Sequence, residues 1–171
     1  RLSTKLGFEL DEAIAEVMSA CSPWLGAEPP ARLVDELIKL LLSGHALACL
    51  HNIRRMGVDA SVHPFLQVLI EQDLDESFIQ LALENTDARL AVGKPVSPAF
   101  LLAALLWQEV KRCSEILETA GLPAQVALTQ AMDQVLDLQA EQLAIPRRFG
   151  SQMKEIWLMQ PRFLSRQGKR A

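Results

Sequence analysis

The stretch SPAFLLAALLW, residues 97–107, decides the fold of this chain. Ser97 is a preferred helix-capping residue, and Pro98 suits the first helical position because an N–H there would have no partner anyway. The residues that follow are apolar on every side, which is typical of a buried helix rather than a surface helix. We therefore predict that this helix is the central, most buried element and that its continuation from Glu109 to Glu118 is amphipathic.

The remaining sequence is also helical in character. Leucine and alanine dominate, tyrosine is absent, and no alternating strand pattern of useful length occurs. Helix-starting and helix-ending residues place the other expected helices at residues 11–20, 30–43, 45–55, 62–71, 77–91 and 124–144. We predict an all-α fold, an irregular array of about eight or nine helices. The segment from Gly93 to Pro95 is the best candidate for a boundary between subdomains. We therefore expect two subdomains, residues 1–93 and 94–171, with one continuous helical domain as the alternative.

Helical periodicity also predicts which faces are buried. The helix after Pro30 is expected to bury Leu33, Leu37, Leu40 and Leu41. The helix at 77–91 is expected to bury Phe78, Leu81, Ala82 and Leu90, and the helix at 124–144 is expected to bury Leu128, Ala131, Met132, Val135 and Leu138. On the outer face after Pro30, the spacing predicts ion pairs Arg32–Glu36 and Asp35–Lys39.

The last 26 residues, 146–171, differ from the rest in charge. They hold one acid, Glu155, and seven basic residues, a net charge of +6: Arg147, Arg148, Lys154, Arg162, Arg166, Lys169 and Arg170. The other 145 residues hold ten basic and twenty acidic residues, a net charge of −10. A basic segment on an acidic body indicates a polyanionic partner on one side of the molecule.

Nucleic acid is the partner that this segment suits best. If the chain is helical after Pro161, the basic residues at 162, 166, 169 and 170 share one face, as a row of phosphate contacts requires. The alternative is a solvated basic helix that balances the acidic body. Flat rings among cations suit nucleotides, but Trp157 stands at helical spacing from Met153 and Gln160, which favours a core position over a base platform. Pro161 predicts a kink or two helical pieces.

The sequence lacks most catalytic signatures. It contains no glycine-rich phosphate loop, no HExxH, no CxxC and no GxSxG. One acid cluster exists, at Glu71, Asp73, Asp75 and Glu76, and we interpret it as a solvated turn at a helix N-terminus rather than a metal site. The set His45, Cys49 and His51 has no obvious fourth ligand, since His63 is not clearly placed, so we interpret it as helical residues. We predict neither a catalytic residue nor a metal ligand in this chain.

The cysteines and the apolar runs limit the class of protein. Cys21, Cys49 and Cys113 are an odd number and stand far apart, which argues against a disulfide framework and fits a reducing cytoplasm. Cys113 is expected to be a small apolar filler. No apolar run reaches the roughly 20 residues that cross a bilayer, so no membrane partner is expected. The start at Arg1, without Met, suggests an excised fragment.

Several stretches resemble the bacterial poly(A) polymerases, which belong with the CCA-adding tRNA enzymes to the class II nucleotidyltransferases. In the basic segment these are IPRR (145–148), IW (156–157), Arg162 and RQGKRA (166–171). RLSTKLGF (1–8), Pro30 to Leu41, NTDAR (85–89) and residues 97–107 agree with the family in the same order. The resemblance covers nearly the whole chain, and the tail and the 97–107 helix are specific to the polymerases.

The resemblance implies the neck and body of such an enzyme, a region associated with RNA binding. The family's catalytic head, with its Gly-Gly turn and Asp-x-Asp metal pair, has no counterpart in this sequence. Arg1 corresponds to the last arginine of the base-reading motif, so Arg1, Lys5 and Arg32 are weaker candidates for the edge of a nucleotide pocket. The intact parent is expected to transfer AMP from ATP to RNA 3′ ends with Mg²⁺, while this chain alone holds no cofactor and is inactive.

Two alternatives remain open from the sequence. One is the corresponding region of a CCA-adding tRNA nucleotidyltransferase, whose base selection resides mostly in the head. The other is a helical module that docks a protein, such as an RNA helicase or an RNA-degradation protein. The residues favour the interpretation of this chain as a region that binds RNA 3′ ends.

Overall fold

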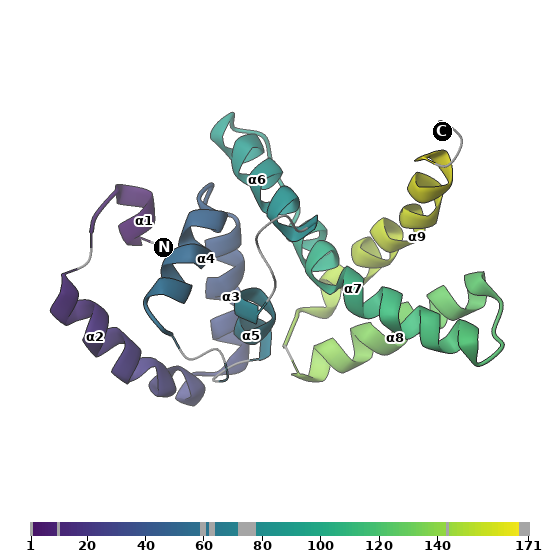
Figure 1. Ribbon diagram of the computed structural model, residues 1–171, viewed down its shortest axis with the longest axis horizontal. Coiled ribbons are helices and arrows are strands. Elements are labelled where there is room, and N and C mark those ends of the chain that lie inside the picture. Colours follow the sequence, from purple (N-terminus) through teal and green to yellow (C-terminus); the bar gives the residue numbers. More distant parts are fainter. Residues whose placement is uncertain are drawn as a thin grey trace. The chain divides into compact units, whose positions relative to one another are not determined.

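The computed structural model describes residues 2–9, 11–58, 61, 64–71, 78–142 and 144–167 (Figure 1). This part is helical and contains no β-strand, which confirms the all-α prediction. The helices are α1 (Leu2–Leu6), α2 (Glu12–Cys21), α3 (Pro30–Leu41), α4 (Ala46–Arg55), α5 (Pro64–Glu71), α6 (Phe78–Ala91), α7 (Pro98–Thr119), α8 (Ala124–Gln142) and α9 (Gly150–Gln167), with 3₁₀ turns η1 (Ser22–Ala27) and η3 (Arg147–Phe149). None of the described helices is long and apolar enough to cross a membrane.

The chain divides into two compact units. The first comprises residues 1–98 with 142–144, and the second comprises residues 99–141 with 145–171. The predicted subdomains 1–93 and 94–171 stay a prediction, since only independent folding of each segment would establish them.

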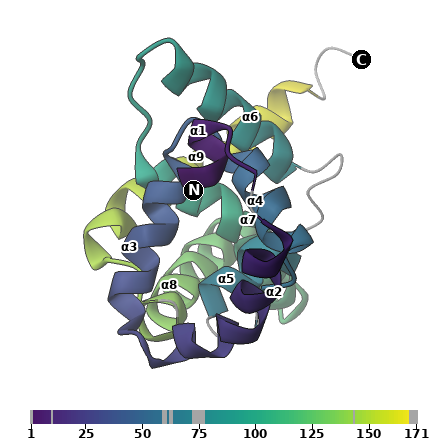
Figure 2. The same cartoon turned by 90° about the vertical axis from the view of Figure 1, so that its left-hand side faces the viewer.

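Helix α4 is the centre of the first unit. It contacts α1, α3, α5 and α6, and α3 lies beside it in both views (Figure 1 and Figure 2). Its residues Ala46, Cys49 and Leu50 are buried, with at most 1% of their surface exposed. Cys49 and Leu50 stand three and four positions after Ala46, so all three share one face of α4, and that face is the one that packs.

Asp87 of α6 caps the N-terminus of α4. Its carboxylate accepts the N–H of Ala46 at 2.9 Å and the N–H of Leu47 at 3.3 Å. These amides are among the four that a helix cannot satisfy by itself, and a negative charge is favoured at that end. A side chain 40 residues away therefore supplies the cap that the sequence before α4 lacks, because His45 makes no side-chain cap bond.

Local predictions in the first unit are partly confirmed. Asp11 caps α2, because its Oδ1 accepts the N–H of Ala13 at 2.9 Å. The buried face of α3 is confirmed at Leu37, Leu40 and Leu41, whereas Val34 is buried in place of Leu33. The predicted ion pairs of α3 are wrong: Arg32 pairs with Glu28, and Lys39 pairs with Glu36.

The inward face predicted for α6 is wrong at two positions. Phe78 is 47% exposed and Leu81 is 57% exposed, while Ala82 is buried as expected. Ile79 and Leu83 occupy the buried positions instead, so the true stripe is offset by one or two residues from the predicted one. Periodicity gives the existence of such a face, and tertiary packing selects which residues line it.

The second unit is built on the apolar half of α7, which forms a hairpin with α8 (Figure 1). As predicted, this half is mostly buried, at Ala99, Leu101, Leu102, Ala103, Ala104, Leu105 and Leu106, although Phe100 is 37% exposed. The core face predicted for α8 is confirmed at Leu128, Ala131, Met132 and Val135, but Leu138 is 48% exposed. Cys113 is not the predicted apolar filler, because it is partly exposed and its Sγ lies 3.1 Å from Oε1 of Gln134.

Helix α9 runs without interruption through Pro161. Of the two predicted outcomes, the division into two helical pieces is therefore wrong, since α9 extends from Gly150 to Gln167 with the proline inside it, and the kink stays a prediction. A proline removes one backbone hydrogen bond from a helix, and the remaining bonds of an 18-residue helix maintain it.

Replacing Asp87 with alanine should lower the free energy of unfolding by about 1 kcal/mol, because the first amides of α4 would lose their acceptor. Urea denaturation followed by circular dichroism measures this change. Glu84→Ala is the matched control, since Glu84 is an exposed acid on the same helix that contacts only Gln80 within it. Equal stability of Asp87→Ala and Glu84→Ala would contradict the cap.

Candidate nucleic-acid interface

The predicted basic segment begins at the turn η3. Pro146 precedes it with φ −59°, and the N–H of Phe149 closes the turn by donating to the Pro146 carbonyl at 3.1 Å. Arg147 and Arg148 project from this turn, and both are exposed. The Arg148 guanidinium lies over the Phe149 ring, 4.8 Å from its centroid, a cation–π contact that orients the cation without neutralising it.

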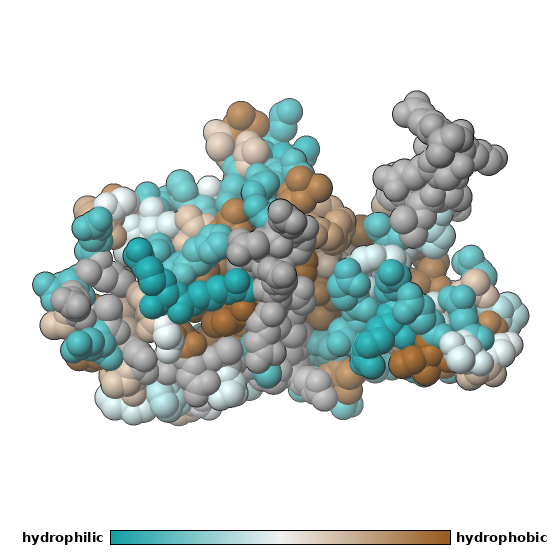
Figure 3. Space-filling view, viewed as in Figure 1, coloured by the Kyte–Doolittle hydropathy of each residue, from teal (hydrophilic) through white to brown (hydrophobic). Residues whose placement is uncertain are grey.

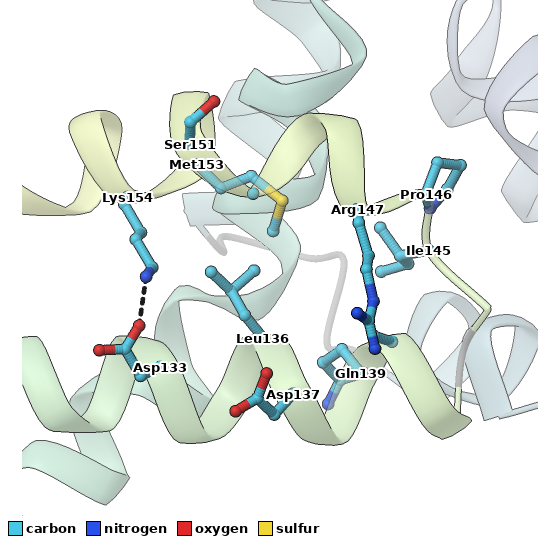
Figure 4. Close-up of a pocket in the computed structure, with 12 residues that line it drawn as sticks. Asp133, Leu136, Asp137, Gln139, Ile145, Pro146, Arg147, Ser151, Met153 and Lys154 are labelled. Atoms are coloured by element: carbon cyan, nitrogen blue, oxygen red, sulfur yellow. Dashed lines mark hydrogen bonds and ion pairs between the residues drawn. The ribbon is translucent and has the colours of Figure 1, made fainter.

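Lys154 of α9 is engaged within the second unit. It forms an ion pair with Asp133 of α8, as Figure 4 shows. The side chains are 40% and 53% exposed, so the pair contributes little to stability. Among the predicted RNA-binding residues whose side chains the structure describes, Lys154 is therefore the one that forms an ion pair.

Trp157 holds α9 against α7. Its indole N–H donates to the carbonyl oxygen of Ala103 at 2.9 Å, and only 1% of its surface is exposed. Met153, one turn earlier, is fully buried. The core interpretation of Trp157 is therefore confirmed, and its ring cannot be a platform for a base.

The other predicted residues of the segment lie at the end of α9 and behind it. Positions 162 and 166 are one helical turn apart within α9, so Arg162 and Arg166 share a helix and a register. The structure does not describe their side chains. Lys169 and Arg170 lie outside the described residues.

The three weaker candidates belong to the first unit. Lys5 is exposed on α1, which is joined to α4 by a hydrogen bond from Asn52 Nδ2 to Thr4 Oγ1 at 3.0 Å. Arg32 is exposed on α3, and its guanidinium lies 3.3 Å from a carboxylate oxygen of Glu28. Arg1 lies outside the described residues.

The structure places no metal-ligand group among the residues that it describes. No three His, Cys, Asp or Glu side chains in that part lie close enough to hold an ion. Of the set considered in the sequence, Cys49 is buried in α4. The acidic residues Asp73, Asp75 and Glu76, the side chain of Glu71 and the whole of His63 lie outside the described residues.

Acidic residues of α7 are engaged with cations of the same helix. Arg112 donates to Glu109 at 2.9 Å, and this hydrogen bond raises the pKa of the guanidinium. Lys111 pairs with Glu115 at 3.8 Å.

On the face drawn in Figure 3, the second unit is largely hydrophilic with smaller apolar areas. Exposed apolar side chains of this unit include Ile116 and Val126.

Sequence reasoning missed two residues of α8 that face the basic segment. Asp133 pairs with Lys154, and Gln139 is buried with only 8% of its surface exposed. Gln139 stands at the predicted helical face beside Val135, so its burial could have been expected from spacing. Its polar character gave no reason to expect it in a core.

The chain is similar to known proteins over its whole length. The family described as "Probable RNA and SrmB- binding site of polymerase A" matches residues 7–69, and the family described as "Polymerase A arginine-rich C-terminus" matches residues 120–171. Poly(A) polymerase I of Escherichia coli O6:H1 is 33% identical over 175 aligned positions that cover all of this chain. Poly(A) polymerase I of Haemophilus influenzae is 34% identical and covers 98% of it. The chain spans 38% of the length of each of these relatives.

Replacing Trp157 with phenylalanine should lower the free energy of unfolding by about 2 kcal/mol, because the smaller ring leaves a cavity and the bond to Ala103 is lost. Urea denaturation measures the loss. Trp24→Phe is the matched control, since Trp24 is 74% exposed. A Trp157→Phe variant of unchanged stability, with weakened RNA binding, would show instead that the ring stacks on bases.

Proposed function

This chain belongs to the bacterial poly(A) polymerase family, and on that premise we propose that it holds single-stranded RNA by the phosphates of the strand. The observation that carries the proposal is the basic segment, with seven basic residues and one acid, fixed to the second unit by buried Trp157. Phosphate contacts supply affinity without sequence selection and need only a row of cations.

Charge favours the C-terminal of the two family-matched segments as the RNA contact. Residues 7–69 hold four basic and eight acidic residues, a net charge of −4. Residues 120–171 hold seven basic and four acidic residues, a net charge of +3, and all seven basic residues follow Pro146. A polyanion is attracted to the second of these and repelled by the first at long range.

Six residues are the proposed phosphate contacts. Arg147 and Arg148 are exposed at the N-terminal end of the segment, and neither forms an ion pair with another described residue. Arg162 and Arg166 continue the row on α9, followed in sequence by Lys169 and Arg170. Lys154 is a weaker contributor, because Asp133 would have to release it first.

We further propose that the whole enzyme of which such a region is a part transfers AMP from ATP to RNA 3′ ends. Mg²⁺ would neutralise the phosphates of ATP in that reaction. The residues described here do not fit such an ion, since no three potential ligands lie together. The role proposed for this chain is therefore to hold the strand, and RNA 3′ ends are its proposed partner.

A second candidate function is protein docking on the first unit. Helix α2 and turn η1 expose a run of apolar side chains, Ile14 at 52%, Val17 at 60% and Trp24 at 74%. The family that matches residues 7–69 names SrmB beside RNA in its description. Exposed apolar residues on an acidic segment suit a protein better than a polyanion, so we propose this surface for that partner. The CCA-adding alternative has no support among the relatives found, which are named poly(A) polymerase I.

Neutralising three of the proposed phosphate contacts together, Arg162→Gln, Arg166→Gln and Lys169→Gln, should flatten the slope of log affinity against log salt by roughly 2 to 3 units. Fluorescence anisotropy with a labelled oligoribonucleotide over a salt series measures it. The matched control neutralises Lys39, Lys111 and Arg112, which pair with acids of their own helices. An unchanged slope in the first variant, or an equal change in both variants, would reject these residues as phosphate contacts.

The purified chain by itself should incorporate no AMP from ATP into an RNA primer in the presence of Mg²⁺. The reason is the absence of a carboxylate group able to hold the ion among its described residues. Extension of a labelled primer, resolved on a denaturing gel, provides the measurement. A ladder of products from a homogeneous sample would overturn this expectation, and a full-length bacterial poly(A) polymerase serves as the positive control.

A further inference from the structure

The contact between Arg148 and Phe149 in η3 differs in kind from the arginine ion pairs that the structure describes. Arg112 of α7 donates from Nε and from a terminal nitrogen to the carboxylate of Glu109, which occupies the N–H edge of the guanidinium and balances its charge. Arg148 is held by an aromatic ring instead, with its guanidinium carbon 4.8 Å from the centroid of Phe149. A ring covers one side of the guanidinium and leaves both its charge and its N–H edge available.

The rest of the Arg148 guanidinium is open to a ligand. Arg148 is exposed, and it forms no hydrogen bond or ion pair with another described residue. Because Phe149 covers one side of the guanidinium, a ligand can reach the opposite side and the N–H edge. The neighbouring Arg147 is also exposed and adds a second cation to the same turn.

The turn η3 fixes the position of this arginine before any ligand binds. The N–H of Phe149 donates to the Pro146 carbonyl at 3.1 Å, and the chain continues directly into α9, which buried Trp157 anchors. An arginine side chain has much rotamer freedom to lose when a ligand orders it. The contact with the ring restricts that freedom in advance, so that binding costs less conformational entropy.

A nucleotide with an unpaired base offers a partner to each open part of Arg148. Its phosphate accepts hydrogen bonds from the N–H edge of a guanidinium, and its flat base stacks on the guanidinium plane. In a duplex, neighbouring bases already cover both faces of each base, so the second contact is lost. Both contacts together therefore favour a single strand over a duplex.

We propose that Arg148, ordered by the ring of Phe149, is a stacking site for one unpaired base of RNA. The proposal rests on the proposed function, because the strand must first be held by its phosphates. It adds to phosphate binding a contact with the base, and hence a preference for strands whose bases are free to stack. The site takes any base, because every base has a flat face.

The test compares oligo(U) with an abasic oligoribonucleotide of equal length, by fluorescence anisotropy on the intact chain over a salt series. The two strands carry the same number of phosphates, so contacts with phosphates alone would bind them equally. We expect oligo(U) to bind about ten-fold more tightly, which is within the range for one stacked base.

The variant Arg148→Lys separates stacking from charge, because lysine keeps the positive charge and has no flat face. It should reduce the ratio of the two affinities from about ten to about one. Its salt slope should equal that of the wild type, since the number of cations is unchanged. Arg112→Lys is the matched control, because Arg112 is an exposed arginine of the second unit outside the basic segment. This control should keep the ten-fold ratio.

Each other outcome decides between the claims. Equal wild-type affinity for the two strands, with salt-dependent binding of both, would overturn the stacking site and leave the proposed function intact. A ratio that stays near ten in Arg148→Lys would place the base contact elsewhere and would also overturn the site. Absence of salt-dependent binding by either strand would overturn the proposed function itself. The wild-type comparison needs no variant, so an Arg148→Lys protein that fails to fold does not affect it.

Discussion

The buried contact between Trp157 of α9 and Ala103 of α7 is the constraint on which the interface depends. Charge attraction alone would not fix an arginine-bearing helix in one orientation on an acidic unit. The indole supplies a large apolar surface for burial and one N–H, which donates to the Ala103 carbonyl at 2.9 Å. Because residues 101–106 of α7 are all buried, this part of the helix offers a firmly packed support for the basic segment.

Given that anchor, the charges of the segment divide into two groups. Lys154 faces α8 and is balanced by Asp133, so it belongs to the packing of the unit. Arg147 and Arg148 lie before the anchor on a 3₁₀ turn and are exposed. Arg162 and Arg166 lie beyond it on the same helix. The anchor thus holds the segment on the second unit, and of the basic residues whose side chains are described, Lys154 is paired within the unit while Arg147 and Arg148 are exposed.

The sequence predicts the helices well because their signals are local. Asp11, Pro30 and Pro98 mark helix ends that depend on the chemistry of single residues. Asp87 as the cap of α4 could not be predicted, since it lies 40 residues from the amides that it binds. Leu138 is exposed and Gln139, one helical turn after Val135, is buried in its place, because the neighbouring segment decides which side of α8 is covered. The charge of the segment was evident from the sequence, whereas the pairing of Lys154 with Asp133 required the packing.

The measurement that tests the account most directly is the mapping of single-stranded oligo(A) onto the chain by backbone amide chemical shifts. If the basic segment holds the strand, the amides of η3 and α9 shift and those of α2 to α5 do not. Shifts confined to α2, α3, α4 and α5, with η3 and α9 unchanged, would contradict it and would place the RNA on the acidic first unit.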